Sequence, residues 1–506
     1  MNIDFHIASR LRSFTSAVMC AAFLLSSTAF AERPDPANDE STHEADTVAV
    51  APQPQAEGKP KMSRAVNIHC LRAFKKPTFL PQGDQDDLWE RDFLTGWWGG
   101  VRSDLWDNGI EFVAAMIWET YNNVGGVNQG FFGGGDPKTG WAQFSILIAS
   151  FDIQTGEAGL WHGGMIHLTT AMTNGESMAY EFAGNLNPNY YYDNSFADYF
   201  KVFEMFYEQK ILEDKFAIRF GQIYPYVLIG ACPTGCALMN GSFHYPTYIG
   251  SSLFRTSDGR AYGQGLGPAF IAAPLGLHLR YDPSRAWRAI LQVNDGHVDP
   301  SGGRFLDNEH GLNPVIKDEE GYEIIGHLSH NTNTRPEDEG LPGTYTVGFQ
   351  AHTGTFGHKF ATESGEPVLV DGNHMFFAIG EQKIFEGQAK VKEISVFGKL
   401  MVAPGDINLV TSNTALGISA KGFLFGRSKD YLTVGYSRTE FGDAYVQAVA
   451  SGGGRVVPEQ VIEATYSAYF SPWLLLRPGI QWVMNPFGND IGEDPFIIGM
   501  STRISL

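Results

Sequence analysis

Hydrophobic and polar residues alternate along many short stretches of this chain, most clearly between Pro472 and Leu506, where two alternating runs are joined by a loop. The first run places large apolar residues on one face, namely Leu474, Leu476, Ile480 and Trp482. Its other face carries Arg477, Gly479 and Gln481. The second run repeats the pattern with Phe496, Ile498, Met500, Thr502, Ile504 and Leu506 on one face. A side-chain period of two predicts β-strands, so these runs form a predicted hairpin.

The same alternation predicts strands through much of the chain after residue 110. The first has an apolar face made of Ile110, Phe112, Ala114, Met116 and Trp118, opposite Glu111 and Glu119. Seven later stretches repeat the pattern, over residues 142–148, 203–208, 216–220, 345–350, 394–400, 416–424 and 462–470. In the first of these the apolar face is Ala142, Phe144, Ile146 and Ile148. In the second it is Phe203, Met205 and Tyr207, opposite Glu204 and Glu208.

The apolar faces indicate that lipid covers one side of these strands and water the other. Segments of about ten residues that contain these stretches recur along the chain, as expected for tilted strands that cross a membrane. Aromatic residues gather near predicted strand ends, at Trp118, Tyr121, Trp141, Tyr469, Phe470 and Trp473. Only helices and closed barrels satisfy every backbone group in lipid, and no stretch approaches the roughly 18 apolar residues of a membrane helix. We therefore expect an all-β fold, a transmembrane antiparallel β-barrel.

The connections between the predicted strands have two lengths. Leu212 to Lys215 is a short turn, whereas Asp295 to Gly343 reads as one long polar loop. This alternation predicts a barrel with one trimmed end and one end with long outer loops. A long loop must also fold inward to narrow the interior, and the two candidates are Gln222 to Gly265 and Asp295 to Gly343.

The N-terminal part of the chain differs in composition from the rest. Arg10 and Arg12 precede a short apolar run and the small-residue site Ala29-Phe30-Ala31, so residues 1–31 are a predicted secretory signal peptide. Residues 32–85 are rich in Pro, Ala, Glu and Asp, which indicates a disordered extension or linker. The barrel domain is predicted over residues 86–506, with a short helix at Val101 to Asp107 that Gly109 ends.

Charge and cysteine content restrict the classes of partner. The formal net charge is −20, which argues against nucleic acid because the chain offers no basic face for phosphates. Cys232 and Cys236 lie four residues apart, and in an oxidising compartment a small loop disulfide is the leading interpretation. A metal site would require two further ligands nearby. Cys70 is then left over after this pairing, either as a free thiol or as an intermolecular link.

Four blocks of the chain carry a family resemblance. They are the opening block over 94–130, the hairpin over 203–222, the turn with Gly426, Arg427 and Asp430, and the closing block with Glu463, Tyr466, Pro472-Trp473, Pro478, Gln481 and Asn485-Pro486. In this order they resemble the carbohydrate-selective porin family OprB. Two positions depart from the family pattern: Trp97 replaces an acidic residue, and Leu506 stands where such barrels commonly end in an aromatic residue.

The resemblance implies a 16-stranded barrel in the outer membrane of a Gram-negative bacterium that lets small sugars diffuse passively. It implies no enzymatic activity, no cofactor and no metal. The expected partners are small carbohydrates and outer-membrane lipid, with the protein acting as a monomeric barrel or a homo-oligomer. A barrel of 16 strands is wide enough to enclose an aqueous channel.

A sugar pore requires side chains that replace the hydration water of the solute and then release it. The candidates are charged or amide residues predicted to face the lumen inside the matching blocks: Glu204, Glu208, Arg219, Gln222, Lys421, Arg427, Glu463, Arg477, Gln481 and Arg503. Each of them could instead pack the barrel wall without touching solute. Arg102, on the short helix, is expected to anchor that helix to the barrel.

Two other functions stay open from the sequence. A barrel of this kind would also suit another small solute, such as an organic acid or a small aromatic compound. A secreted glycoside hydrolase would share the signal peptide and needs only two carboxylates, but it gives no reason for apolar outer strand faces. The sequence contains neither the G-x-S-x-G nor the H-E-x-x-H motif of common hydrolases.

Overall fold

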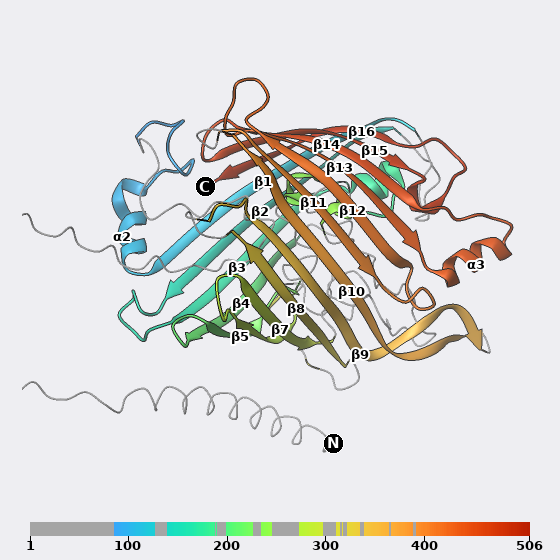
Figure 1. Ribbon diagram of the computed structural model, residues 1–506, viewed down its shortest axis with the longest axis horizontal. Coiled ribbons are helices and arrows are strands. Elements are labelled where there is room, and N and C mark those ends of the chain that lie inside the picture. Colours follow the sequence, from blue (N-terminus) through green and yellow to red (C-terminus); the bar gives the residue numbers. More distant parts are fainter. Residues whose placement is uncertain are drawn as a thin grey trace, which may run out of the picture. The chain divides into compact units, whose positions relative to one another are not determined.

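The alternating stretches form the strands of one closed antiparallel β-barrel in the computed structural model (Figure 1). The structure describes residues 86–126, 139–187, 189, 199–225, 234–244, 273–296, 310–313, 316, 321–333, 338–363, 366–387 and 391–506. The predicted signal peptide, the predicted extension and Cys70 lie outside these residues. Each strand pairs with its neighbours in sequence, and β1 pairs with β16, which confirms the expected barrel of 16 strands.

The strands have the following bounds: β1 Ile110–Gly125, β2 Gly140–Gln154, β3 Gly164–Gly175, β4 Tyr199–Ile211, β5 Phe216–Gln222, β6 Leu275–Tyr281, β7 Trp287–Asp295, β8 Tyr322–Thr332, β9 Gly343–Glu363, β10 Glu366–Glu386, β11 Glu393–Val402, β12 Val410–Lys421, β13 Tyr431–Phe441, β14 Glu459–Tyr469, β15 Leu474–Met484 and β16 Phe496–Ser505. The helices are α2 Val101–Asp107 and α3 Asp443–Ser451, with short helical turns η2 Trp98–Gly100, η3 Ala179–Ala183, η5 Gly235–Ala237, η6 Gly241–Phe243 and η9 Pro486–Gly488. Among the described residues, no helix is long and apolar enough to cross a membrane.

The barrel closes where the first and last strands meet. The register runs from Ala115 opposite Ser505 to Gly125 opposite Phe496, so the last strand pairs with the first. This ladder begins at Ala115, although β1 itself begins at Ile110. The predicted helix and its glycine are also confirmed: Gly109 follows α2 with a φ of +75°, a left-handed conformation that a residue without Cβ adopts freely.

The two faces of most strands follow the predicted alternation. On β15, Ile480 and Trp482 are 46% and 43% exposed on the outside, whereas Gln481 between them is 1% exposed. The stretch over residues 142–148 corrects the prediction, because its apolar face points inward. Ala142, Phe144, Ile146 and Ile148 are all buried and belong to one hydrophobic cluster with Met178, Ala183 and Leu186 of the β3–β4 connection. This apolar face was expected to contact lipid, but it packs against apolar side chains of a loop that enters the barrel.

Two further segments differ from the sequence prediction. The register of β3 against β4 shifts between Thr169 and Thr170, so that Phe203 is an extra residue at a β-bulge. Phe203 is consequently buried, with its ring centroid 4.9 Å from that of Tyr224, instead of facing outward with Met205. The segment from Asp295 to Gly343 is not a single loop, because it contains β8, which pairs with β7 and β9.

Candidate functional site

The two ends of the barrel have different connections. At one end, called here the turn end, short segments such as 212–215 join neighbouring strands, and β1 begins there. At the other end, called the loop end, β3 and β4 are separated by residues 176–198, and β5 and β6 by residues 223–274. The predicted difference between a trimmed end and an elaborated end is therefore confirmed.

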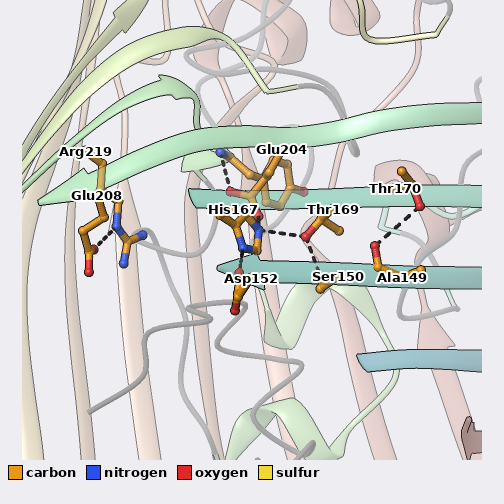
Figure 2. Close-up of polar contacts among 10 residues, drawn as sticks. Ala149, Ser150, Asp152, His167, Thr169, Thr170, Glu204, Glu208 and Arg219 are labelled. Carbon is orange, nitrogen blue, oxygen red and sulfur yellow. Dashed lines mark hydrogen bonds and ion pairs between the residues drawn. The ribbon is translucent and has the colours of Figure 1, made fainter. Parts of the chain in front are cut away.

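A cluster of buried charges lies on β4, β5 and β6 inside the barrel. Arg219 Nε donates a hydrogen bond to Glu208 Oε2, and Lys210 Nζ lies 3.9 Å from Glu208 Oε1. The guanidinium carbon of Arg219 lies 4.9 Å from the ring centroid of Phe206. Arg219 and Glu208 are 4% and 1% exposed, and Figure 2 shows the two side chains side by side. The predicted residues Glu208 and Arg219 thus form one ion pair on adjacent strands.

A second buried group surrounds His167 on β3, a residue that sequence analysis did not select. His167 Nδ1 lies 2.5 Å from Asp152 Oδ1, and His167 Nε2 lies 2.8 Å from the hydroxyl oxygen of Thr169 (Figure 2). Glu204 Oε2 lies 3.8 Å from His167 Nε2, and Glu204 Oε1 accepts a hydrogen bond from the backbone N–H of Tyr224 at 2.9 Å. The predicted residue Glu204 therefore joins the barrel wall to the start of the β5–β6 loop.

A chain of hydrogen bonds crosses β6 to β9 on the inner face. His278 Nδ1 lies 3.0 Å from Gln292 Oε1, and Gln292 Nε2 donates to Asn294 Oδ1 at 2.9 Å. Asn294 and Gln350 then both donate to the carboxylate of Glu323, at 2.6 and 2.5 Å. None of these five residues was predicted as a site residue, because they lie outside the matching blocks. Their period-two positions, such as Gln292 and Asn294, were the available signal.

Two loops from the loop end are held against the inner face of β14. Glu459 accepts hydrogen bonds from the backbone N–H groups of Leu186 at 2.6 Å and Asn187 at 3.3 Å. Glu463 accepts from the backbone N–H groups of Met239 at 2.5 Å and Asn240 at 2.8 Å. Of the two loops named as candidates for inward folding, Gln222 to Gly265 therefore contacts the inner face through its residues 234–244. The inward β3–β4 loop was not predicted.

Small and polar residues on β13 complete this inner wall. Ser242 Oγ lies 2.5 Å from Ser437 Oγ. A Cβ atom at Gly435 would lie 2.4 Å from Leu238 Cδ1 and 2.6 Å from Phe243 Cε1, so a larger residue there would displace these loop side chains. The loop is therefore packed as tightly as a protein core.

His244 lies in the β5–β6 loop, directly after the helical turn η6. Its Nε2 lies 2.8 Å from the carbonyl oxygen of Leu238, and its own carbonyl oxygen accepts a hydrogen bond from Lys399 Nζ. Burial, together with the positive charges of Lys399 and Arg477, lowers the pKa of His244 to about 3. His244 is therefore neutral at neutral pH, and the predicted residue Arg477 lies on the inner face near it.

The remaining predicted residues lie in separate places. Lys421 Nζ lies 3.0 Å from Glu393 Oε1 at the turn end, and Gln222 Nε2 donates to the carbonyl oxygen of Gly311 at 2.9 Å. Arg503 faces inward on β16 and is 8% exposed. Cys236 is disulfide-bonded, and its predicted partner Cys232 lies outside the described residues.

Arg427 does not join any of these inner clusters. It lies in the β12–β13 turn, donates from Nε to Asp430 and from Nη2 to the carbonyl oxygen of Tyr469 at 2.8 Å, and its side chain is 39% exposed. The hydrogen bond to Asp430 raises its pKa. Arg427 therefore fastens a turn that follows the end of β12 at Lys421, and its predicted place in the lumen stays a prediction.

Comparisons with known proteins agree with this geometry. Residues 143–506 match the model of the family described as "Carbohydrate-selective porin, OprB family". Porin B of Pseudomonas aeruginosa is 21% identical over 446 residues, which cover 81% of this chain and 90% of that protein. The putative porin QuiX of Acinetobacter baylyi is 24% identical over 272 residues, which cover 49% of this chain and 59% of that protein.

Among solved structures, the high-pH structure of Pseudomonas putida OprB superposes with a TM-score of 0.71. The match covers 83% of this chain and 99% of that chain at 18% sequence identity, so it shows a common fold. The family match, which spans well over half of the sequence, then settles the classification. This chain belongs to the carbohydrate-selective porins of the OprB family, which are outer-membrane β-barrels.

Proposed function

We propose that this outer-membrane porin conducts small carbohydrates by passive diffusion, and that buried charged pairs inside the barrel provide the hydrogen bonds along the route. One observation carries the assignment of residues. Glu208 and Arg219 face inward from adjacent strands as a buried ion pair, in a barrel that two loops enter from the loop end. A pair of this kind presents donors and acceptors at one place in a fixed geometry.

The chemistry needed is exchange of hydrogen bonds and nothing covalent. A sugar hydroxyl both donates and accepts, so a carboxylate next to a guanidinium can replace two of its water molecules at once when the side chains that cover the pair move aside. Because the two charges already compensate each other, the pair favours a neutral polyol over an ion of either sign. Binding stays weak, since each exchange replaces one hydrogen bond with another.

Within this proposal the predicted residues divide into two groups. Glu208, Arg219, Lys421, Arg477 and Arg503 are placed along the solute route. Glu204, Gln222, Glu463 and Gln481 hold loop backbone or loop side chains, so they set the shape of the route. Residues 1–31 are proposed to be removed on export, which leaves residues 32–85 before the barrel; N-terminal sequencing of the mature protein tests this division.

The deciding experiment is single-channel recording of the purified protein in a planar bilayer. Glucose or a short oligosaccharide at high concentration should reduce the ion current in a concentration-dependent way, because a solute in the narrow region excludes ions. A small organic acid serves as the competing solute. Block by the organic acid without any block by the sugars would reject the carbohydrate assignment and favour a channel for another solute.

A further inference from the structure

Gln481 on β15 contacts both loops that enter the barrel. Its Oε1 accepts hydrogen bonds from Asn189 Nδ2 at 2.8 Å and from Asn240 Nδ2 at 3.3 Å, and its Nε2 donates to the carbonyl oxygen of Asn189 at 3.0 Å. Asn189 belongs to the β3–β4 loop and Asn240 to the β5–β6 loop. Loop segments about 50 residues apart in sequence therefore meet at one amide group that is 1% exposed.

Two carboxylates on β14, at inward positions separated by Val461, hold the same two loops. Glu459 also accepts from Asn187 Nδ2 at 3.0 Å and from the backbone N–H of Phe487 at 2.8 Å, and Thr465 donates to Glu463 at 2.7 Å. Gln481 lies directly opposite Glu463 in the β14–β15 register. The contacts of both loops thus converge on three inward side chains of two paired strands.

We infer that Glu459, Glu463 and Gln481 act as one latch, which holds both loops in the barrel and makes them leave the wall together. This inference rests on the proposed function in one respect, namely that the loops narrow the solute route. It goes further by identifying positioning residues that would determine the largest solute admitted.

The coupling has a direct physical cause. If the β5–β6 loop leaves the wall, Asn240 is lost as a partner of Gln481, and the backbone N–H groups of Met239 and Asn240 no longer donate to the carboxyl group of Glu463. A buried charge or amide without its partners is costly, so the arrangement that also holds Asn189 is weakened. Tight packing makes the change a switch between two arrangements and not a gradual shift.

Amide hydrogen exchange on the folded barrel in detergent tests the latch residue by residue. In Glu463→Gln, exchange at Met239 and Asn240 should rise about tenfold or more, because the two N–H groups bond to different oxygens of Glu463 and an amide keeps only one acceptor oxygen. The coupling predicts that exchange at Leu186 and Asn187 also rises, although Glu459 is intact. Ser467→Ala is the matched control, since Ser467 lies on the same inward face of β14, two inward positions further along.

The variant Gln481→Met removes the shared amide and leaves both carboxylates in place. It should speed exchange in both loops, and in its background Glu463→Gln should no longer affect Leu186 and Asn187. If Glu463→Gln affects only the β5–β6 loop when Gln481 is present, the two loops are independent and the inference is overturned. Retention of the heat-dependent gel shift identifies the variants that still fold.

Liposome swelling then connects the latch to solute size. The swelling rate for a trisaccharide relative to a monosaccharide should increase in Glu463→Gln and Gln481→Met but not in Ser467→Ala. Increased exchange in both loops without a change in this ratio would show that the latched loops do not set the size limit. Wild-type protein that never admits a monosaccharide would instead reject the proposed function, and the exchange measurement would still decide the coupling.

Discussion

Arg102 Nη2 donates a hydrogen bond to the carbonyl oxygen of Leu506 at 2.9 Å, which joins helix α2 to the end of β16. Figure 1 shows the C-terminal end of the chain close to α2. Arg102 Nη1 also donates to the carbonyl oxygen of Gly96 at 3.0 Å, and its guanidinium carbon lies 3.9 Å from the ring centroid of Phe93. The predicted anchoring role of Arg102 is therefore observed, and it acts beside the seam between β1 and β16.

Arg102→Ala should destabilise the barrel. Burial lowers the pKa of Arg102 to about 10, which still leaves it charged at neutral pH, so the substitution removes charge-assisted hydrogen bonds and a cation–π contact. We expect the free energy of unfolding to fall by ~2–4 kcal/mol, measured from the temperature of the heat-dependent gel shift. Asp104→Ala, on the exposed side of the same helix, is the control. Equal transition temperatures for wild type and Arg102→Ala would contradict this role.

Arg219→Gln should weaken sugar block of the current. Gln keeps hydrogen-bonding capacity but removes the charge paired with Glu208, so the half-blocking concentration of glucose should rise about threefold to tenfold. Single-channel recordings at fixed voltage measure this concentration. The proposed route would need to be moved elsewhere in the barrel if the half-blocking concentration stayed at its wild-type value.

Arg427→Ala should give the opposite result. Arg427 fastens the β12–β13 turn through Asp430 and Tyr469, so its loss should leave the half-blocking sugar concentration unchanged. The free energy of unfolding should fall by only about 1 kcal/mol, because the side chain is partly exposed to solvent. A large change in sugar block with unchanged stability would return Arg427 to the solute route.

Acidification should release the β5–β6 loop through His244. The pKa of His244 is depressed from 6.5 to about 3 in the folded protein, so between these values the released state binds more protons than the native state. The free energy that holds the loop should therefore fall as pH falls across this window, by up to about 1.4 kcal/mol per pH unit from this group. Below pH 3 its contribution should no longer change.

Open-channel current noise at about pH 4.5 and at neutral pH measures this release. His244→Gln retains a donor for the carbonyl oxygen of Leu238 but does not titrate. It should remove the part of the acid-induced noise that comes from His244. The same increase in noise in both proteins would assign the acid response to other groups.

The sequence predicted the outer surface of this protein better than its interior. Alternation placed Ile480, Trp482 and Gln481 on their observed faces, because lipid and a polar lumen impose opposite preferences on alternate residues. For Ala142 to Ile148 the same pattern gave the wrong side. An inward apolar face can pack against apolar side chains of an entering loop, just as an outward apolar face contacts lipid. The local sequence is the same in both cases and does not distinguish them.

Only part of the candidate site could be predicted from the sequence, and the reason is related. Glu208 and Arg219 occupy neighbouring strands of one hairpin, so their pairing follows from a short turn and a fixed register. The contacts of Glu459 with Leu186 and of Gln481 with Asn240 join positions more than 200 residues apart. Only the path of the loops through the barrel determines such contacts, and strand periodicity contains no information about that path.

The size of the residue at position 435 affects how the β5–β6 loop packs inside the barrel. The inner wall has room for Leu238 and Phe243 because position 435 lacks a methyl group. The number of strands sets the circumference of a barrel, but side-chain volumes at such contact points set the width of the channel inside it. Relatives with the same 16-stranded barrel can therefore differ in the solutes they admit through single substitutions of this size, while the lipid-facing surface stays the same.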